Sequence, residues 1–443
     1  MINILTNQEK EKYVFNVIFS VCNTEYSFNS KADLTISYGK NIPLIKGKHI
    51  HIYQSDFWDN YKKKESMPQR PLKRFYYNDL FKDLIGLFYK KNTKNIIEQK
   101  GELIVLNLDI IASIFFMITR YEEYIQLEMK DEHQRFPAEE SIAYKEGFLM
   151  RPIVNEYIEL LFYLIKKLNP DIGISKRKFE VFMTHDVDHL LMYDNFPIKR
   201  LTCDLIRKKS FNLFIKSLIC FLKGKWHYRK DYKKDPYWLF HYFLKEEKGV
   251  KNVFYFMSGG TFKWEKEYNI KDKKVLELIK ELQDSKVEIG LHGSYYSFNN
   301  KSRLKKEKKI LDNILGIKKY GIRQHYLKFD IKKTLQIQNE LDFKYDTTCG
   351  YSKHEGFRFG ICCPFRVYDL ERDKALDLIE IPLIVMDVTL KDHRKLTIDE
   401  AIKVIQNLKN VCQKHNGVFT TLWHNSFFYE NEEWKKVYKE CII

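Results

Sequence analysis

Strand-like and helix-like segments alternate through residues 179–423, and this alternation constrains the fold more than any other feature of the sequence. Short apolar runs typical of buried strands are separated by stretches with apolar residues at three- and four-residue intervals, which are typical of helices. The expected strands are residues 179–183, 253–257, 287–291, 322–327, 380–386 and 417–423, and the expected helices are 272–282, 303–315, 335–341 and 397–415. Repeated strand–helix units predict an α/β fold with parallel strands, in an open sheet or a barrel.

Five of these strands are followed by polar side chains that can bind a metal or transfer a proton. Because the carboxyl ends of parallel strands lie on one face of a sheet or barrel, we expect these side chains to meet there. Asp186 and Asp188 are two positions apart, so in an extended chain they leave the strand on the same side. The complete set is Asp186, Asp188, His292, Ser294, Arg323, His325, Tyr326, Asp387, His424 and Asn425.

This set of side chains suits the hydrolysis of an amide or an ester. Carboxylates and imidazoles from separate strands can hold zinc or a similar divalent ion and leave one coordination position open for water. A free carboxylate beside that water can act as a base, a histidine opposite can protonate the leaving group, and an arginine can keep the base ionised. The chain has no glycine-rich phosphate loop of standard spacing and no G-x-S-x-G elbow, which argues against phosphoryl transfer and serine hydrolysis.

The net charge of +17 does not by itself predict a nucleic-acid-binding protein. The cationic excess is spread along the chain apart from a local peak at residues 199–234, and we expect no nucleic-acid partner. Within that peak, the apolar residues of 211–222 could form a helix flanked by cations. Such a helix could contact an anionic membrane surface, or it could pack on its own domain, which is the interpretation that the pattern favours.

The protein is expected to be cytoplasmic, at most peripheral at the inner membrane face. Its N-terminus lacks the basic start and apolar region of an export signal, and no apolar run is long enough to span a membrane. The eight cysteines show no paired C-x-x-C spacing, so reduced thiols are expected. Turn residues at 169–173 predict a smaller α/β domain over residues 1–175 and a larger domain over 176–443, with the basic segment 199–234 as an insertion.

Four short motifs, in order between residues 180 and 425, resemble those of the polysaccharide deacetylase family, the NodB-like carbohydrate esterases of family 4. Thr-His-Asp-Val-Asp at 184–188 resembles the first motif, Thr-Phe-Asp-Asp-Gly, and Gly-Leu-His-Gly-Ser-Tyr-Tyr at 290–296 resembles the second. Arg-Gln-His-Tyr at 323–326 stands where the family has Arg-x-Pro, and Leu-Trp-His at 422–424 matches Leu-x-His. Residues 120–124 and 135–137 look like an uncharacterised domain joined to a divergent bacterial branch of this family.

The resemblance implies a distorted (β/α) barrel that removes N- or O-acetyl groups from sugars with the help of a divalent metal, with zinc as the first choice. It implies that Asp186 is the general base, that Arg323 orients this base, and that His424 is the general acid. It also implies that Asp188 and His292 are metal ligands.

One departure from the family pattern concerns the metal site. The second motif ordinarily ends in a further histidine, and Tyr296 stands at that position. Catalytic zinc usually has three protein ligands, so either His325 or His185 would have to supply the third nitrogen. Three further residues are expected to contact the sugar: Tyr326, Trp423 and Asp346. Asp346 could pair with Arg323 inside the site, or it could only cap a turn before Thr347.

Together these inferences predict a metal-dependent hydrolase that removes an acetyl group from an N-acetylated sugar, in a polysaccharide or in its cytoplasmic precursor. The alternative is a glycan-binding protein on the same fold without catalysis, because the motif histidine is missing at position 296. The two hypotheses differ in whether a third ligand lies near Asp188 and His292.

Overall fold

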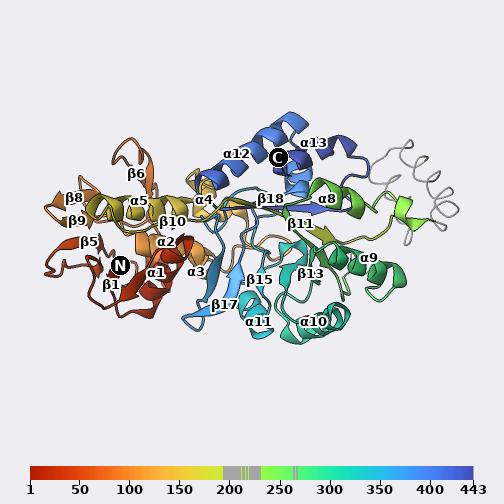
Figure 1. Cartoon of the computed structure of the whole chain (residues 1–443), viewed down its shortest axis with the longest axis horizontal. Coiled ribbons are helices and arrows are strands. Elements are labelled where there is room, and N and C mark those ends of the chain that lie inside the picture. The colour runs from red at the N-terminus through yellow and green to blue at the C-terminus, as the bar shows by residue number, and fades with distance from the viewer. Residues whose placement is uncertain are drawn as a thin grey trace.

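The structure is a computed structural model, and it describes residues 1–192, 231–262, 265 and 268–442, with the isolated residues 211, 215 and 218. Two sheets organise the chain, one formed before residue 107 and the other after residue 179, and Figure 1 shows them side by side. The basic segment expected at 199–234 lies almost entirely outside the described residues. Within the described part, no helix is both long and apolar enough to cross a bilayer.

The N-terminal region, residues 1–175, contains a six-stranded sheet of order β3-β1-β4-β5-β9-β8. All neighbouring strands are parallel except β8 and β9. The strands are β1 (Ile2–Leu5), β3 (Tyr26–Phe28), β4 (Leu34–Gly39), β5 (Lys48–Tyr53), β8 (Ile97–Lys100) and β9 (Leu103–Leu106). The helices are α1 (Glu9–Val21), α2 (Ile110–Ile118), α3 (Tyr121–Ile125), α4 (Ile142–Lys145) and α5 (Ile153–Leu168).

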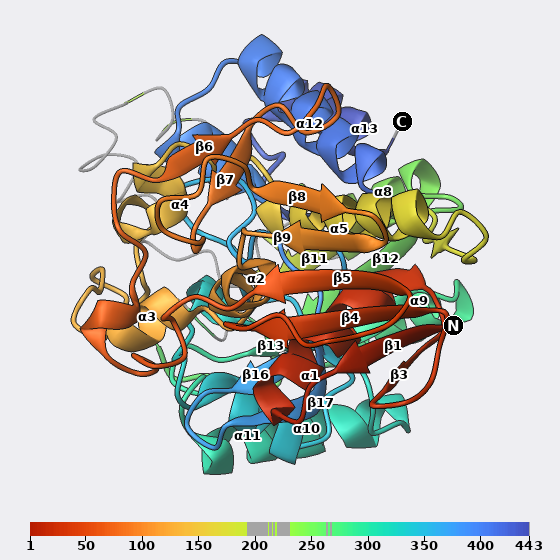
Figure 2. The same cartoon turned by 90° about the vertical axis from the view of Figure 1, so that its left-hand side faces the viewer.

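Two small two-stranded sheets complete this region. In one, β2 (Cys22–Asn23) pairs with β10 (Ser175–Lys176), and in the other β6 (Lys73–Phe75) pairs with β7 (Leu84–Gly86). All nine residues of helix α2 are buried, and eight of them are apolar, as expected for a helix that is packed on every side. Figure 2 shows the six-stranded sheet in front of the C-terminal region, with α2 behind it.

The C-terminal region contains a nine-stranded sheet of order β16-β17-β15-β14-β13-β12-β11-β19-β18. All neighbouring pairs are parallel except β16 and β17, which confirms the predicted α/β class with parallel strands. The strands are β11 (Glu180–Val187), β12 (Lys251–Phe256), β13 (Glu288–Gly293), β14 (Gly321–Gln324), β15 (Tyr345–Asp346), β16 (Phe365–Asp369), β17 (Lys374–Glu380), β18 (Val385–Met386) and β19 (Val418–His424).

Among the described residues, six helices cover this sheet. Figure 1 shows α12 and α13 above the strands and α10 and α11 at the bottom, with α8 and α9 towards the right. Their bounds are α8 (Phe240–Glu246), α9 (Lys273–Asp284), α10 (Lys301–Leu315), α11 (Thr334–Glu340), α12 (Ile398–Lys414) and α13 (Lys435–Ile442). The start of α12 is fixed by a capping box, in which Thr397 accepts the N–H of Glu400 and Glu400 accepts the N–H of Thr397.

The expected barrel is not confirmed, because among the described strands β16 and β18 each pair with one neighbour and leave the sheet open. The expected strand 380–386 is divided: β17 ends at Glu380 and β18 contains only two residues. Pro382 lies between them and has no N–H for a strand ladder. The chain from Glu380 to Val385 can span at most roughly 17 Å. Because β17 and β18 lie near opposite edges of the sheet in the strand order, the sheet must curl strongly to bring them within that distance.

A buried cluster of charged residues joins the two regions. Glu123, from α3, accepts two hydrogen bonds from Arg358, with Nε to Oε1 at 2.9 Å and Nη2 to Oε2 at 2.7 Å. Arg120 donates from Nε to Glu123 Oε1 at 2.8 Å and from Nη2 to Glu122 Oε1 at 2.6 Å. All four side chains are almost fully buried, so each charge depends on its partners to compensate for lost hydration.

Candidate metal centre and catalytic site

The C-terminal ends of neighbouring strands form a pocket of about 390 Å³. Strand register places Asp186 of β11 beside His424 of β19, and His292 of β13 beside Arg323 of β14. The polar groups that follow separate strands in the sequence therefore meet in space, as expected for a parallel sheet. The pocket is lined by Glu132, His133, Arg135, Asp186, Asp188, His189, His325, Tyr326, Leu327, Ser352, Met386, Val388, His393, Leu422 and His424.

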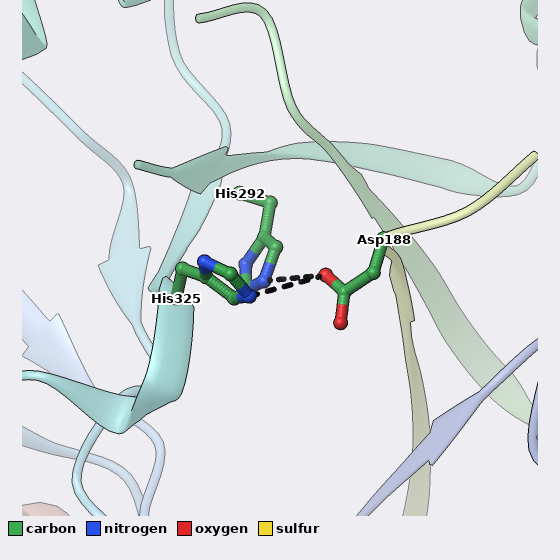
Figure 3. Close-up of side chains that lie close together, drawn as sticks. All are labelled: Asp188, His292 and His325. Atoms are coloured by element: carbon green, nitrogen blue, oxygen red, sulfur yellow. Dashed lines mark ion pairs between the residues drawn. The ribbon is translucent and has the colours of Figure 1, made fainter. Parts of the chain in front are cut away.

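Asp188, His292 and His325 form the candidate metal centre. One ligand atom from each lies within 4.8 Å of the other two (Figure 3). Asp188 Oδ1 is 3.2 Å from His292 Nε2 and 3.8 Å from His325 Nε2. Two imidazoles and one carboxylate form a ligand set typical of catalytic zinc, which keeps a further position open.

The other ring nitrogen of each histidine is already engaged in a hydrogen bond. His292 Nδ1 donates to the backbone carbonyl of Arg323 at 3.0 Å, and His325 Nδ1 donates to Glu265 Oε1 at 3.1 Å. Because carbonyl and carboxylate oxygens only accept hydrogen bonds, each Nδ1 must carry the proton. When the ring is neutral, each Nε2 therefore presents a lone pair, which is the usual arrangement of metal-binding histidines.

The electrostatics of these groups favour a cation between them. Asp188 Oδ1 and His292 Nε2 are buried 3.2 Å apart, and neither atom makes a hydrogen bond to another described residue. Burial raises the pKa of Asp188, but the neighbouring His325, His292 and His424 outweigh burial and hold the pKa well below its usual range. Burial lowers the pKa of His292, but Asp186 and Asp188 outweigh it and raise that pKa.

Asp186 and Arg323 form a fully buried ion pair beside the metal centre. Arg323 Nη1 donates to Asp186 Oδ1 at 3.1 Å and to Thr184 Oγ1 at 2.7 Å, and Nε donates to the carbonyl of Thr347 at 3.1 Å. The guanidinium also lies over the ring of Tyr255, 4.9 Å from its centroid. These contacts fix the arginine, so that Asp186 is held as an oriented carboxylate. Its other oxygen, Oδ2, is 3.7 Å from His292 Nε2.

His424 faces the same pocket from β19 and is oriented by Asp387, which follows β18. Its Nδ1 lies 2.9 Å and 3.1 Å from the two oxygens of Asp387, and its backbone N–H donates to Asp387 Oδ2 at 2.7 Å. Its Nε2 is 3.6 Å from Asp188 Oδ2. Burial lowers the pKa of His424, but Asp387, Asp188 and Asp186 outweigh burial and raise it to about 10. This histidine can therefore deliver a proton into the pocket.

His185, the alternative third ligand, does not lie in the site. Its ring is fully buried between Phe243 and Phe254, with centroid distances of 4.2 Å and 4.5 Å. Its Nε2 lies 2.6 Å from Glu247 Oε1 and its Nδ1 lies 3.1 Å from the carbonyl of Trp423. Side chains alternate along a strand, so His185 leaves β11 on the opposite face from Asp186.

Trp423 and Asp346 were predicted to contact the substrate, but both are buried and neither lines the pocket. Trp423 is 1% exposed and stacks on Phe428, on the opposite face of β19 from His424. Asp346 is fully buried and accepts hydrogen bonds from the backbone N–H and Oγ1 of Thr348, at 2.8 Å and 2.6 Å, and from Gln338. It therefore stabilises a turn inside the protein, the second of its two predicted roles.

The two motif tyrosines differ in their relation to the pocket. Tyr326 is half-buried and lines the pocket next to His325, so its predicted contact with substrate remains a prediction. Tyr296 is 46% exposed, does not line the pocket, and packs its ring edge against Phe262. It offers no imidazole, and His325 supplies the nitrogen near Asp188 instead.

Some residues and contacts of the site were not predicted from the sequence. Glu265, which fixes His325, lies outside every motif, and no local pattern identifies it. Asp387 was among the polar residues that follow a strand, which could have indicated its pairing with His424. His133 and Arg135 come from the N-terminal region, where the separation in sequence hides their contribution to the pocket.

Comparisons with known proteins add a distant context to this geometry. Residues 1–170 match the model of a family of unknown function, DUF7033, and this is the part that resembles an uncharacterised domain. No curated protein matches the chain. Among solved structures, a candidate polysaccharide deacetylase from Mycobacterium smegmatis is similar, with 15% identity and a TM-score of 0.38, over 60% of this chain and 83% of the other. This likeness is too distant to assign a fold or an activity.

Proposed function

We propose that the protein is a metal-dependent hydrolase that removes an acetyl group from an N-acetylated sugar, in a polysaccharide or in a precursor of one. The observation that carries this proposal is the meeting of three candidate metal ligands, a carboxylate–arginine pair and a carboxylate–histidine pair at one edge of the sheet. Buried charges are costly, and their concentration beside a pocket is typical of catalytic sites.

Each group has a role in this reaction. A divalent metal held by Asp188, His292 and His325 would polarise the acetyl carbonyl and the attacking water, and the ligand set favours zinc. Asp186, oriented by Arg323, would take a proton from the water as its oxygen bonds to the acetyl carbon.

The second half of the reaction breaks the bond between the acetyl carbon and the sugar nitrogen. His424, held by Asp387, would pass a proton from Nε2 to the departing nitrogen, so that the products are acetate and a free amino sugar. Tyr326 would flank the sugar at the mouth of the pocket.

A glycan-binding protein without catalysis is the second candidate, because position 296 is a tyrosine. The nitrogen of His325 near Asp188 favours the enzyme over this candidate. A binding protein would also have no need for a histidine whose proton is held by a buried carboxylate.

Metal content and acetate release test the proposal. The purified full-length protein is analysed for zinc and incubated with a panel of N-acetylated saccharides, with Asp186→Asn as the control. We expect about one zinc per chain in both proteins. We expect acetate release to fall roughly 10²–10⁴-fold in the variant, the range typical of a lost general base. No zinc and no acetate across the panel would reject the enzyme, and sugar binding without zinc would support the second candidate.

A further inference from the structure

The turn that carries His325 has an unusual backbone. Residues His325–Leu327 form a single 3-10 turn directly after β14, and two of them have left-handed backbone angles. Tyr326 has φ 61° and ψ 16°, and Leu327 has φ 52°. Neither residue is a glycine, and such strained angles persist only where surrounding contacts hold them. The position of the third candidate ligand therefore depends on what holds this turn.

A hydrogen bond from the N-terminal region holds the centre of the turn. Arg135 is 8% exposed, and its Nη1 donates to the backbone carbonyl of Tyr326 at 2.8 Å. The rest of the guanidinium is fixed by Asp131, whose Oδ2 lies 2.8 Å from both Nε and Nη2. Asp131 Oδ1 accepts hydrogen bonds from the backbone N–H groups of His133 and Arg135. Residues 131–135 therefore form a hydrogen-bonded loop that orients the Arg135 side chain towards the carbonyl of Tyr326.

His133, from the same loop, is connected through Tyr295 to Glu265, the residue that orients His325. The ring of His133 lies 4.7 Å from the ring of Tyr326, and its Nδ1 is 3.0 Å from the hydroxyl of Tyr295. The backbone N–H of Tyr295 donates to Glu265 Oε1, the same oxygen that accepts the hydrogen bond from His325 Nδ1. The loop 131–135 therefore supports His325 through its backbone and through its hydrogen-bonded partner.

We propose that the N-terminal region is a structural part of the metal centre, with Arg135 as a positioning residue that holds His325 through the carbonyl of Tyr326. This inference rests on the proposed function for the identity of the ligand, but the contact that it invokes is independent of activity. It assigns a role to a region that matches a family of unknown function. It also connects two features of the chain, the ligand at position 325 and the additional N-terminal region.

Zinc affinity of the full-length protein tests the role of Arg135. In Arg135→Met, a side chain of similar length keeps the apolar packing and removes every side-chain donor, whereas Arg135→Lys keeps a cationic donor group and should recover part of the affinity. We expect the methionine variant to bind zinc 10–100-fold more weakly, the effect typical of losing a residue that orients a ligand. The matched control is Arg151→Met, because Arg151 pairs with Glu156 and Asp83 of the N-terminal region and does not line the pocket.

Hydrogen exchange in the metal-free proteins separates this inference from the proposed function. We expect amides of residues 325–328 to exchange at least tenfold faster in Arg135→Met than in the wild type, with no such change in Arg151→Met. Exchange and zinc affinity both within twofold of the wild type would overturn the inference, as would equal effects of the two methionine variants. If the wild type binds no zinc, the proposed function fails, and hydrogen exchange alone decides whether Arg135 holds the turn.

Discussion

Replacing His325 by alanine should remove the third metal ligand, and the size of the effect can be derived from the site. Zinc binding by four protein ligands is worth roughly 10–16 kcal/mol, which is about 2.5–4 kcal/mol for each ligand. At about 1.4 kcal/mol for each tenfold change, the loss of one ligand predicts zinc affinity lower by about 10²–10³-fold. The remaining atoms, Asp188 Oδ1 and His292 Nε2, lie 3.2 Å apart and can still bind the ion weakly.

Two variants serve as controls for this measurement, which is made by competition with a chelator of known zinc affinity. His354→Ala removes a histidine that pairs with Glu139 and does not line the pocket, so it should not change the affinity. Tyr296→Ala should also have no effect, because this exposed ring does not line the pocket. Zinc affinity of His325→Ala within threefold of the wild type would refute the ligand assignment, and so would an equal loss in Tyr296→Ala.

Two further variants test the catalytic acid and the junction between the regions. Asp387→Asn should lower kcat at least 10²-fold and change KM little, because His424 loses the carboxylate that holds its proton and its orientation; steady-state acetate release measures both parameters. Glu123→Gln should lower the free energy of unfolding in urea by about 3–5 kcal/mol, because Arg358 is left as an uncompensated buried charge. Burial raises the pKa of Glu123, but its arginine partners outweigh burial and keep the pKa below 4.5. The full difference in unfolding free energy between the wild type and Glu123→Gln is therefore expected above pH 4.5. It should shrink as the pH falls further and Glu123 becomes protonated.

The order of strands and helices was accessible from the sequence because burial leaves a periodic pattern. The helix expected at 397–415 is α12, and the strand expected at 287–291 is β13, each displaced by one or two residues. Whether the sheet closes into a barrel could not be predicted from the sequence. It depends on whether the edge strands pair, and the two-residue strand β18 and the antiparallel strand β16 leave no apolar pattern long enough to read.

A stricter use of strand alternation would have shown from the sequence which predicted site residues face away from the pocket. The alternation that places Asp186 and Asp188 on one side of β11 also places His185 on the other side, and the same alternation separates Trp423 from His424. The support of His325 by Glu265 could not have been derived. Their contact joins residues sixty positions apart, and its geometry depends on the packing of the intervening elements.

The cost of burying charge is the strongest physical reason to favour an enzyme over a binding protein. Asp186, Arg323 and Asp387 are buried at one edge of the sheet, and replacing a whole buried ion pair by apolar residues of similar volume is often neutral or stabilising. Sugar recognition alone needs hydroxyl-binding groups and aromatic faces, not a buried arginine beside a carboxylate or a histidine with its proton held by another acid. Proton transfer needs both arrangements, because the base must stay ionised while the acid stays protonated in the same pocket.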